Sequence, residues 1–319
     1  MWLLRPFVAD FSMFFAISGR IEAEGVTAMD WLRSVNPSLI LFGLCAFLFL
    51  LAVGGGFALY QEAWYFQIPF GVINGFMVFL GFTVLHDACH FSFSRRRWMN
   101  ELIMILAWPM FVFSPFLFRR IHLEHHAKTN QGDSDPDHFT ASPKLWKRLM
   151  KSFFLIFYYH VFAFQHFKHP RWRRHLILSA FGPIFLIYLA LITAFAKPLI
   201  LTWLIPNVIG IGILSYVNTA WPHHPARETS RYRNTRNTFV PWWIQALMFN
   251  QNMHLVHHLR PSLPWYRYPE FYKAHQLEIA RNSGQGLFYT QRKEYYELQP
   301  LWLRHYKEIV AKLLIGEWR

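Results

Sequence analysis

Three short segments of the chain concentrate histidine at spacings that suit metal binding. They read HDACH at 86 to 90, HLEHH at 122 to 126 and HLVHH at 254 to 258. Residues four apart share one face of an α-helix, so the first and last histidine of each segment could hold one metal ion. In the two HxxHH segments the adjacent histidines point about 100° apart, so that one segment can reach two metals. The spacing therefore predicts a two-metal centre.

The residue types also narrow the chemistry. Imidazole suits iron, zinc, copper and nickel alike, so the sequence alone leaves the metal open. The absence of an obvious hydrolytic nucleophile favours redox or oxygen chemistry over Lewis-acid hydrolysis. Cys45 and Cys89 form no CxxC cluster, which argues against zinc–cysteine and iron–sulfur sites. A membrane metal transporter is the weaker alternative, because it would place ionisable ligands at mid-membrane, where the apolar stretches have almost none.

The elements that must position these histidines are membrane helices. The chain has 319 residues, of which 54% are hydrophobic and 16% charged. Four uncharged stretches, at 39 to 60, 64 to 85, 176 to 196 and 199 to 217, are long enough to cross a bilayer, which takes about 20 helical residues. Short links pair them into two hairpins. We therefore expect an all-α integral membrane fold with four transmembrane helices.

Two further apolar stretches are expected to be re-entrant or interfacial. Residues 102 to 118 contain Pro109 and Pro115 and have arginines on both sides, and residues 237 to 253 are interpreted in the same way. A single domain covers 1 to 319, with an interfacial N-terminal segment at 1 to 36, a core at 39 to 269 and a cytoplasmic helical cap at 270 to 319.

Loop charge predicts the orientation. Of the 32 lysines and arginines, only Lys197 falls in a short outer link, so both termini are expected in the cytoplasm, across a bacterial inner membrane. This distribution accounts for the net charge of +14, and no nucleic-acid partner is needed to explain it. Arg227, Arg231, Arg233 and Arg236 fit the same rule, and they could also dock an acidic ferredoxin.

The histidine segments and the hairpin pattern resemble the membrane fatty acid desaturase superfamily over roughly 39 to 269. HLEHHAKTNQGDSDPDHF, QNMHLVHHLRPSLPWYRY and WPHHPARETSRYR are most similar to its β-carotene hydroxylase branch. The resemblance implies a non-haem di-iron centre, O₂ as co-substrate and a separate ferredoxin-like or cytochrome b5-like electron donor. It implies hydroxylation of the β-ionone ring of a carotenoid such as β-carotene, with desaturation or hydroxylation of an acyl lipid as the alternative.

The resemblance also assigns iron ligands. The boxes carry over to His86, His90, His122, His125, His126, His254, His257 and His258. A ninth ligand follows an asparagine at the cytoplasmic end of the last membrane helix in related desaturases. Here that asparagine is Asn218, expected to act as an outer or water-mediated ligand, and the ninth ligand is expected to be His223, with the adjacent His224 as the alternative.

Carboxylates near the boxes are candidates to hold the ligand imidazoles, because metal-bound histidines commonly donate their second N–H to an acid. Asp87, Glu124 and one or more of Asp133, Asp135 and Asp137 are these candidates. The DxDxD run does not form a calcium loop, since its sixth and twelfth positions are His138 and Lys144. It can be a simple turn, an aimed set of carboxylates, or both. The run LRPSLPWYRYP at 259 to 269 is either an interfacial aromatic belt or a rigid wall near the metal.

Overall fold

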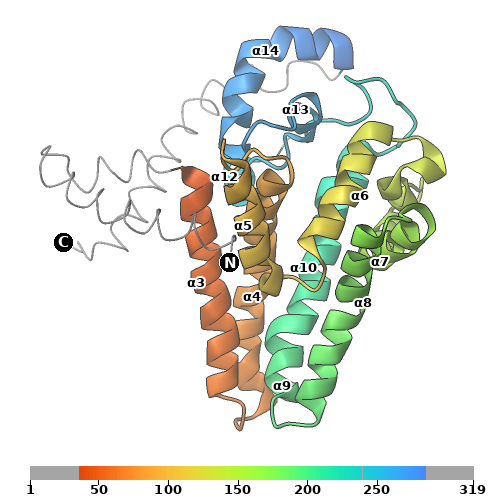
Figure 1. Ribbon diagram of the computed structural model, residues 1–319. Coiled ribbons are helices and arrows are strands. Elements are labelled where there is room, and N and C mark those ends of the chain that lie inside the picture. The colour runs from red at the N-terminus through yellow and green to blue at the C-terminus, as the bar shows by residue number, and fades with distance from the viewer. Residues whose placement is uncertain (1–35, 239, 285–319) are drawn as a thin grey trace, which may run out of the picture.

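The computed structural model describes residues 36–238 and 240–284, and every regular element there is helical. Four helices or runs of joined helices are long and apolar enough to cross a membrane, and they stand side by side in Figure 1. They are Pro37–Ala58, Trp64–Cys89, Pro170–Leu191 and Ala196–His223. The four predicted spans are confirmed, although the third begins earlier, at Pro170, and the fourth continues to His223.

The first hairpin consists of α3 (Pro37–Ala58) and α4 (Ile68–Cys89), with the short helix η1 (Trp64–Gln67) between them. Asn36 caps α3, because its side chain accepts the backbone N–H of Ser38 at 2.9 Å. The second hairpin consists of α8 (Pro170–Leu191) and a continuous run of α9 (Ala196–Leu199), η5 (Ile200–Leu204), α10 (Ile205–Ser215), η6 (Tyr216–Ala220) and α11 (Trp221–His223). Lys197 donates to the carbonyl of Glu62, which ties the tips of the two hairpins together.

Small residues allow α4 and the last span to approach each other closely. A Cβ added at Gly71 would lie 2.6 Å from the backbone oxygen of Leu201, and one added at Gly210 would lie 3.0 Å from a methyl of Val78. Membrane helices lack a hydrophobic force between them, so such close backbone approach supplies much of their attraction. This packing aligns the upper ends of α4 and α11, from which His86 and His223 project.

The predicted re-entrant stretch is sharply broken. Helix α5 (Arg97–Ala107) and η2 (Trp108–Met110) are followed by α6 (Pro115–Lys128) after a bend of 112°. Proline removes a backbone donor and clashes with the preceding turn, so Pro109 and Pro115 account for the break. The indole Nε1 of Trp203 donates to the carbonyl of Pro109 at 2.9 Å and fixes the turn against the last span. Helix α6 then returns with the HLEHH segment toward the upper ends of the spans.

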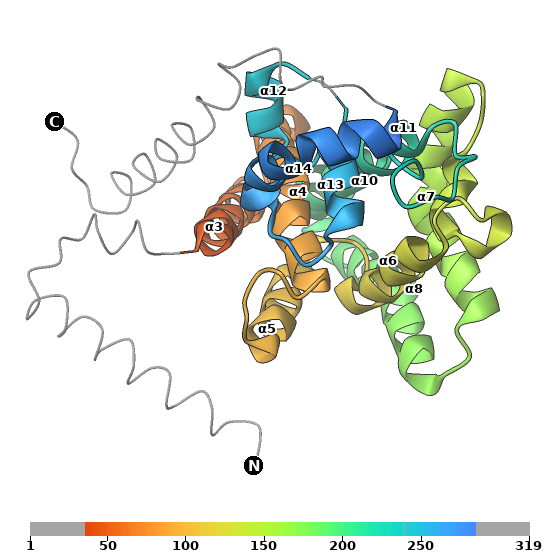
Figure 2. The same ribbon diagram turned by 90° about the horizontal axis from the view of Figure 1, so that it is seen from above.

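The remaining elements lie at the end of the bundle that carries the histidines (Figures 1 and 2). They are η3 (Gly132–Ser134), η4 (Pro136–Thr140), α12 (Trp242–Leu247), α13 (His254–Leu259), η7 (Trp265–Arg267) and α14 (Tyr268–Ser283). The stretch 237 to 253 folds into turns around the short α12 and does not span. Helix α7 (Leu145–His166), which was not expected from the sequence, packs along α10. Of the predicted segments, 1 to 35 and 285 to 319 lie outside the described residues.

Candidate metal centre

Eight of the nine predicted histidines form two compact groups at the upper ends of the spans. Within each group one nitrogen from every ring lies within 4.8 Å of the others. The first group is His86, His90, His122 and His257, and the second is His125, His223, His254 and His258. Each group draws on three different helices, so the centre exists only when the hairpins, α6 and α13 are assembled.

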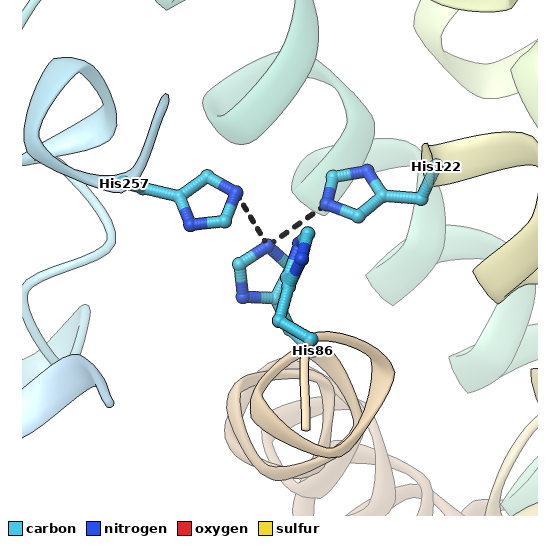
Figure 3. A group of neighbouring side chains, drawn as sticks. His86, His122 and His257 are labelled. Carbon is cyan, nitrogen blue, oxygen red and sulfur yellow. Dashed lines mark hydrogen bonds between the residues drawn. The ribbon is translucent and has the colours of Figure 1, made fainter. Parts of the chain in front are cut away.

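In the first group the ring nitrogens point toward one another. Nε2 of His86 lies 3.0 Å from Nε2 of His122 and 3.1 Å from Nε2 of His257 (Figure 3). Nε2 of His90 is buried and has no hydrogen-bond partner within the described residues. A neutral imidazole has one N–H and one lone pair, so converging rings cannot all satisfy one another. A metal ion between them would accept these lone pairs, so the four rings fit a metal ion.

The second group has the same character. Nε2 of His254 lies 3.1 Å from Nε2 of His223 and 3.2 Å from Nε2 of His258, and Nε2 of His125 lies 3.4 Å from that of His258. Thus His122 and His257 belong to one group, whereas His125 and His254 belong to the other. Each HxxHH segment reaches both groups, as the angular spacing of its histidines requires.

The two candidates for the ninth ligand differ in burial, and His126 lies between the two groups. His223 is buried within the second group, whereas His224 is partly exposed and lines a polar pocket at the surface. His126 lies between the groups, with its Nε2 2.8 Å from Nε2 of His257 and 3.2 Å from Nε2 of His122. The geometry thus favours His223 over His224 as the additional metal-binding residue.

The histidines of α13 are held neutral. Burial lowers the pKa of His257 well below its usual range, and the nearby rings of His86 and His126 lower it further. The pKa of His258 is lowered in the same way, by burial first and then by its imidazole neighbours. Metal ions bind the neutral ring, so these environments keep the lone pairs available at ordinary pH. The donor set is rich in nitrogen and fits iron, zinc or copper.

Contacts from outside the groups fix the rings of His125, His223 and His257. Oδ1 of Asp135 lies 2.8 Å from Nδ1 of His125, and Oδ2 of Asp137 lies 3.6 Å from the same nitrogen. Nδ1 of His223 lies 3.0 Å from the carbonyl oxygen of Asn234, and Nδ1 of His257 lies 3.2 Å from the hydroxyl of Tyr268. Such partners select the tautomer that presents Nε2 to a metal.

The aspartate run is both a turn and a support for His125. Asp135 accepts the backbone N–H groups of Asn130 at 2.7 Å and of Asp137 at 2.9 Å, which shapes the turn. Asp137 accepts the hydroxyl of Tyr159 at 2.5 Å and that of Thr219 at 3.3 Å. Asp133, by contrast, is exposed at the surface.

Asp87 and Glu124, which were expected to support the imidazoles, have other partners. The carboxylate of Asp87 accepts the hydroxyl of Ser38 at 3.0 Å, and Ser38 in turn accepts the indole N–H of Trp265 at 3.1 Å. Glu124 forms ion pairs with Arg120 and Lys128 on its own helix. Within residues 36–238 and 240–284, neither carboxylate contacts a histidine of the two groups. Each is turned away from its neighbouring histidine by the helical rotation per residue.

The run at 259 to 269 forms a wall of the centre. Trp265 and Tyr268 are buried, at 0% and 1% exposure, which excludes an interfacial belt at these two positions. Trp265 joins the third histidine segment to α3 through Ser38, and Tyr268 contacts His257. The importance of Tyr159, Tyr268 and Ser38 was not recognised from the sequence. Only the aromatic and proline content after the third box pointed toward this wall.

A cavity of about 40 Å³ lies beneath the histidines, between α4, α6, α7 and α10. His86, His122 and His254 face it from the polar end, and Phe82, Phe113 and Ile211 are among its apolar walls. Asn218 also lines it. Both polar side-chain atoms of Asn218 are buried and have no hydrogen-bond partner within the described residues. A polar group in this state is expected to have a ligand or water partner in the working protein.

The sequence family described as fatty acid desaturase matches residues 62–291, which include both histidine groups. The chain belongs to this family. It is 26% identical over 273 residues to an sn-1 oleoyl-lipid 12-desaturase of Picosynechococcus sp., covering 75% of this chain and 77% of that protein. The predicted superfamily is thereby confirmed.

Two further relatives extend the comparison. An sn-1 acyl-lipid omega-3 desaturase (ferredoxin) of Nostoc sp. is 24% identical, covering 71% of this chain and 60% of that protein. A chloroplastic omega-6 fatty acid desaturase of Glycine max is 24% identical, covering 73% and 61%. No solved structure matches the chain significantly. These names do not support the carotene hydroxylase branch and favour the acyl-lipid alternative.

Proposed function

We propose that this member of the fatty acid desaturase family is an O₂-dependent acyl-lipid desaturase with a di-iron centre. The observation that carries the proposal is the pair of buried four-histidine groups directly above a cavity with apolar walls at the end of the membrane spans. The desaturases named among the relatives support the choice of an acyl chain over a carotenoid.

The chain's own residues supply the binding of the metals. His86, His90, His122 and His257 would hold one iron, and His125, His223, His254 and His258 the other, with His126 between them. When bound, the iron pair supplies the activation of dioxygen and the oxidation of an unactivated C–H bond. Asp135, Asn234 and Tyr268 keep the rings of His125, His223 and His257 in the orientation that this requires.

The cavity determines where an acyl chain can react. The aromatic side chains beneath the histidines leave a cavity of about 40 Å³, and we expect them to shift when an acyl chain enters. Phe82, Phe113 and Phe118 occupy this space, with the ring of Phe118 5.6 Å from each of the other two. Entry from the bilayer would keep the substrate out of water, and the histidines would face the carbon atoms held at the top. Asn218 would face the same atoms.

Electrons must come from a separate protein. The relative from Nostoc is named as a ferredoxin-type desaturase, which supports a ferredoxin as the donor here. Helix α13, which carries histidines of both groups, lies at the end of the bundle opposite α9 (Figure 1), and we place that end in the cytoplasm. This placement follows the orientation predicted from loop charge, with both termini in the cytoplasm.

The proposal is tested by expressing the protein in a bacterium that accumulates β-carotene, together with a ferredoxin and its reductase. Membrane fatty acids and pigments are then analysed from the same cells. A new double bond in the acyl chains is expected, and it should be absent when His122 is replaced by Ala. A hydroxylated carotenoid with unchanged fatty acids would overturn the acyl-lipid proposal in favour of the carotenoid alternative.

A further inference from the structure

The loop between α11 and α12 carries a net positive charge. Residues 224 to 241 include four arginines but only one acid, Glu228. Arg227, Arg231 and Arg233 are exposed, and Arg236 is half-buried. Within residues 36–238 and 240–284, none of the four forms an ion pair.

The polar contacts of these arginines hold the loop without neutralising it. Arg231 donates to the carbonyl of Leu259 at 3.0 Å, Arg233 to that of Asn282 at 3.2 Å and Arg236 to that of Trp221 at 3.1 Å. Backbone carbonyls orient a guanidinium but leave its net charge in place. The side chains are therefore positioned by the fold, and their charge remains free to act on an external anion.

The arginines border an open pocket of about 430 Å³. Arg227, Arg233 and Arg236 line it together with His223 and His224. The positive field of these side chains is thus concentrated at one recess, which raises the local concentration of an anionic partner.

The same recess leads directly to the second histidine group. His223 lines the pocket, and its Nε2 lies 3.1 Å from Nε2 of His254 within that group. On the other side of the ring, Nδ1 of His223 lies 3.0 Å from the carbonyl oxygen of Asn234, in the loop that carries the arginines. A partner bound on this loop would be separated from the metal centre by little more than one imidazole ring.

We propose that Arg227, Arg231, Arg233 and Arg236 form the docking surface for an acidic one-electron carrier protein. This inference rests on the proposed function. The positive-inside rule explains why arginines lie on this face, but it does not explain why three arginines without an ion pair line one recess beside a metal-binding histidine. A protein fits better than a small anion, because Arg231 extends the positive charge beyond the recess that Arg227, Arg233 and Arg236 line.

The stoichiometry of the reaction gives this surface its role. Converting one CH₂–CH₂ unit to CH=CH with one O₂ consumes two electrons and two protons and releases two molecules of water. A one-electron carrier must therefore dock twice in each turnover, and each docked carrier leaves oxidised. Rapid and reversible docking is needed, which favours charge complementarity over a large apolar interface.

The test compares two variants with the same change in charge. Arg227→Glu/Arg233→Glu reverses the docking surface, whereas Arg95→Glu/Lys273→Glu reverses two exposed charges that do not line the pocket. Each purified protein, in nanodiscs, is titrated with a plant-type ferredoxin at low and high ionic strength. We expect the association rate to fall about tenfold or more in the first variant and to change little in the second. The salt dependence of the wild type should also be largely lost in the first variant.

Iron content and the thermal unfolding midpoint establish that each variant is folded. As a second control, Arg227→Lys/Arg233→Lys keeps both charges and should bind ferredoxin nearly as the wild type does. Equal association rates for both glutamate variants would overturn the proposal. The proposal would also be overturned if the Arg227→Glu/Arg233→Glu variant lost ferredoxin binding only in nanodiscs of anionic lipid. That result would assign the arginines to lipid headgroups. Ferredoxin binding by a wild type that makes no double bond would contradict the proposed function and leave the docking surface standing.

Discussion

Replacing Asp135 with Asn should weaken metal binding without changing a metal ligand. Asp135 is 1% exposed, and its carboxylate accepts three hydrogen bonds. One oxygen faces Nδ1 of His125 at 2.8 Å and the N–H of Asp137 at 2.9 Å, and the other accepts the N–H of Asn130 at 2.7 Å. An asparagine has one acceptor oxygen, so its NH₂ group must face a donor on one side, and at least one bond is lost.

The size of the effect follows from these contacts. A hydrogen bond to a charged group contributes about 1.5–3 kcal/mol, and an outer partner of a metal-bound histidine contributes about 10–100-fold to metal affinity or activity. The two estimates agree, since each tenfold change corresponds to about 1.4 kcal/mol. We therefore expect the Asp135→Asn protein to need about 10–100-fold more free Fe(II) for half-saturation. Anaerobic titration of the purified protein with Fe(II) measures this.

The control lies in the same turn. Asp133 is exposed, and its replacement by Asn removes the same charge without touching His125. The Asp133→Asn protein should bind Fe(II) as the wild type does. Equal half-saturation in both variants would refute the view that Asp135 holds the His125 ring for a metal.

Three further predictions test other parts of the structure. His223→Ala should lose iron and desaturase activity, whereas His224→Ala should retain both. Iron analysis of the two purified proteins measures this, and the reverse result would assign the ninth ligand to His224. Gly71→Ala should destabilise the α4 packing by about 1–3 kcal/mol, because its Cβ would meet a backbone oxygen at 2.6 Å, whereas Gly43→Ala, with open space, should not. Thermal unfolding that lowers both midpoints equally would contradict this packing. Ser38→Ala should lower the midpoint by several degrees, since it removes the hydroxyl that accepts from Trp265 Nε1 and donates to the Asp87 carboxylate, and an unchanged midpoint would show that this link contributes nothing.

The membrane spans and the histidine groups could be predicted because local rules determine them. An uncharged run of about 20 residues has few alternatives to a spanning helix, and helical spacing fixes which histidines share a face. The rotation of about 100° between adjacent positions explains why His257 and His258 reach different groups. Prolines at 109 and 115, together with the arginines on both sides, predicted that this stretch is not a regular span, and a bend of 112° interrupts it.

The outer contacts of the rings could not be predicted, because they depend on how the elements pack. Asp87 and Glu124 are near histidines in sequence, but they are rotated by about 100° and 200° from His86 and His122 and therefore face other partners. The carbonyl oxygen of Asn234 and the hydroxyl of Tyr268 come from segments with no histidine motif of their own. Nothing in the local pattern indicated which ring each would meet.

The substrate could not be predicted from the histidine motifs either. Those motifs hold metal, and substrate choice depends on the walls beneath them, such as Phe82, Phe113 and Ile211. These residues come from three different parts of the chain, so similarity within the boxes carries little information about them. This is why the resemblance to carotene hydroxylases at the boxes and the comparison over most of the chain favour different substrates.

The iron content of the catalytically active protein tests the central claim most directly. Protein purified from cells that show the new double bond should contain about two irons per chain, and both His90→Ala and His258→Ala, one from each group, should lower this number and abolish the product. An active preparation with one iron or fewer per chain, or a His258→Ala protein that keeps full iron and activity, would contradict a centre built from the two histidine groups.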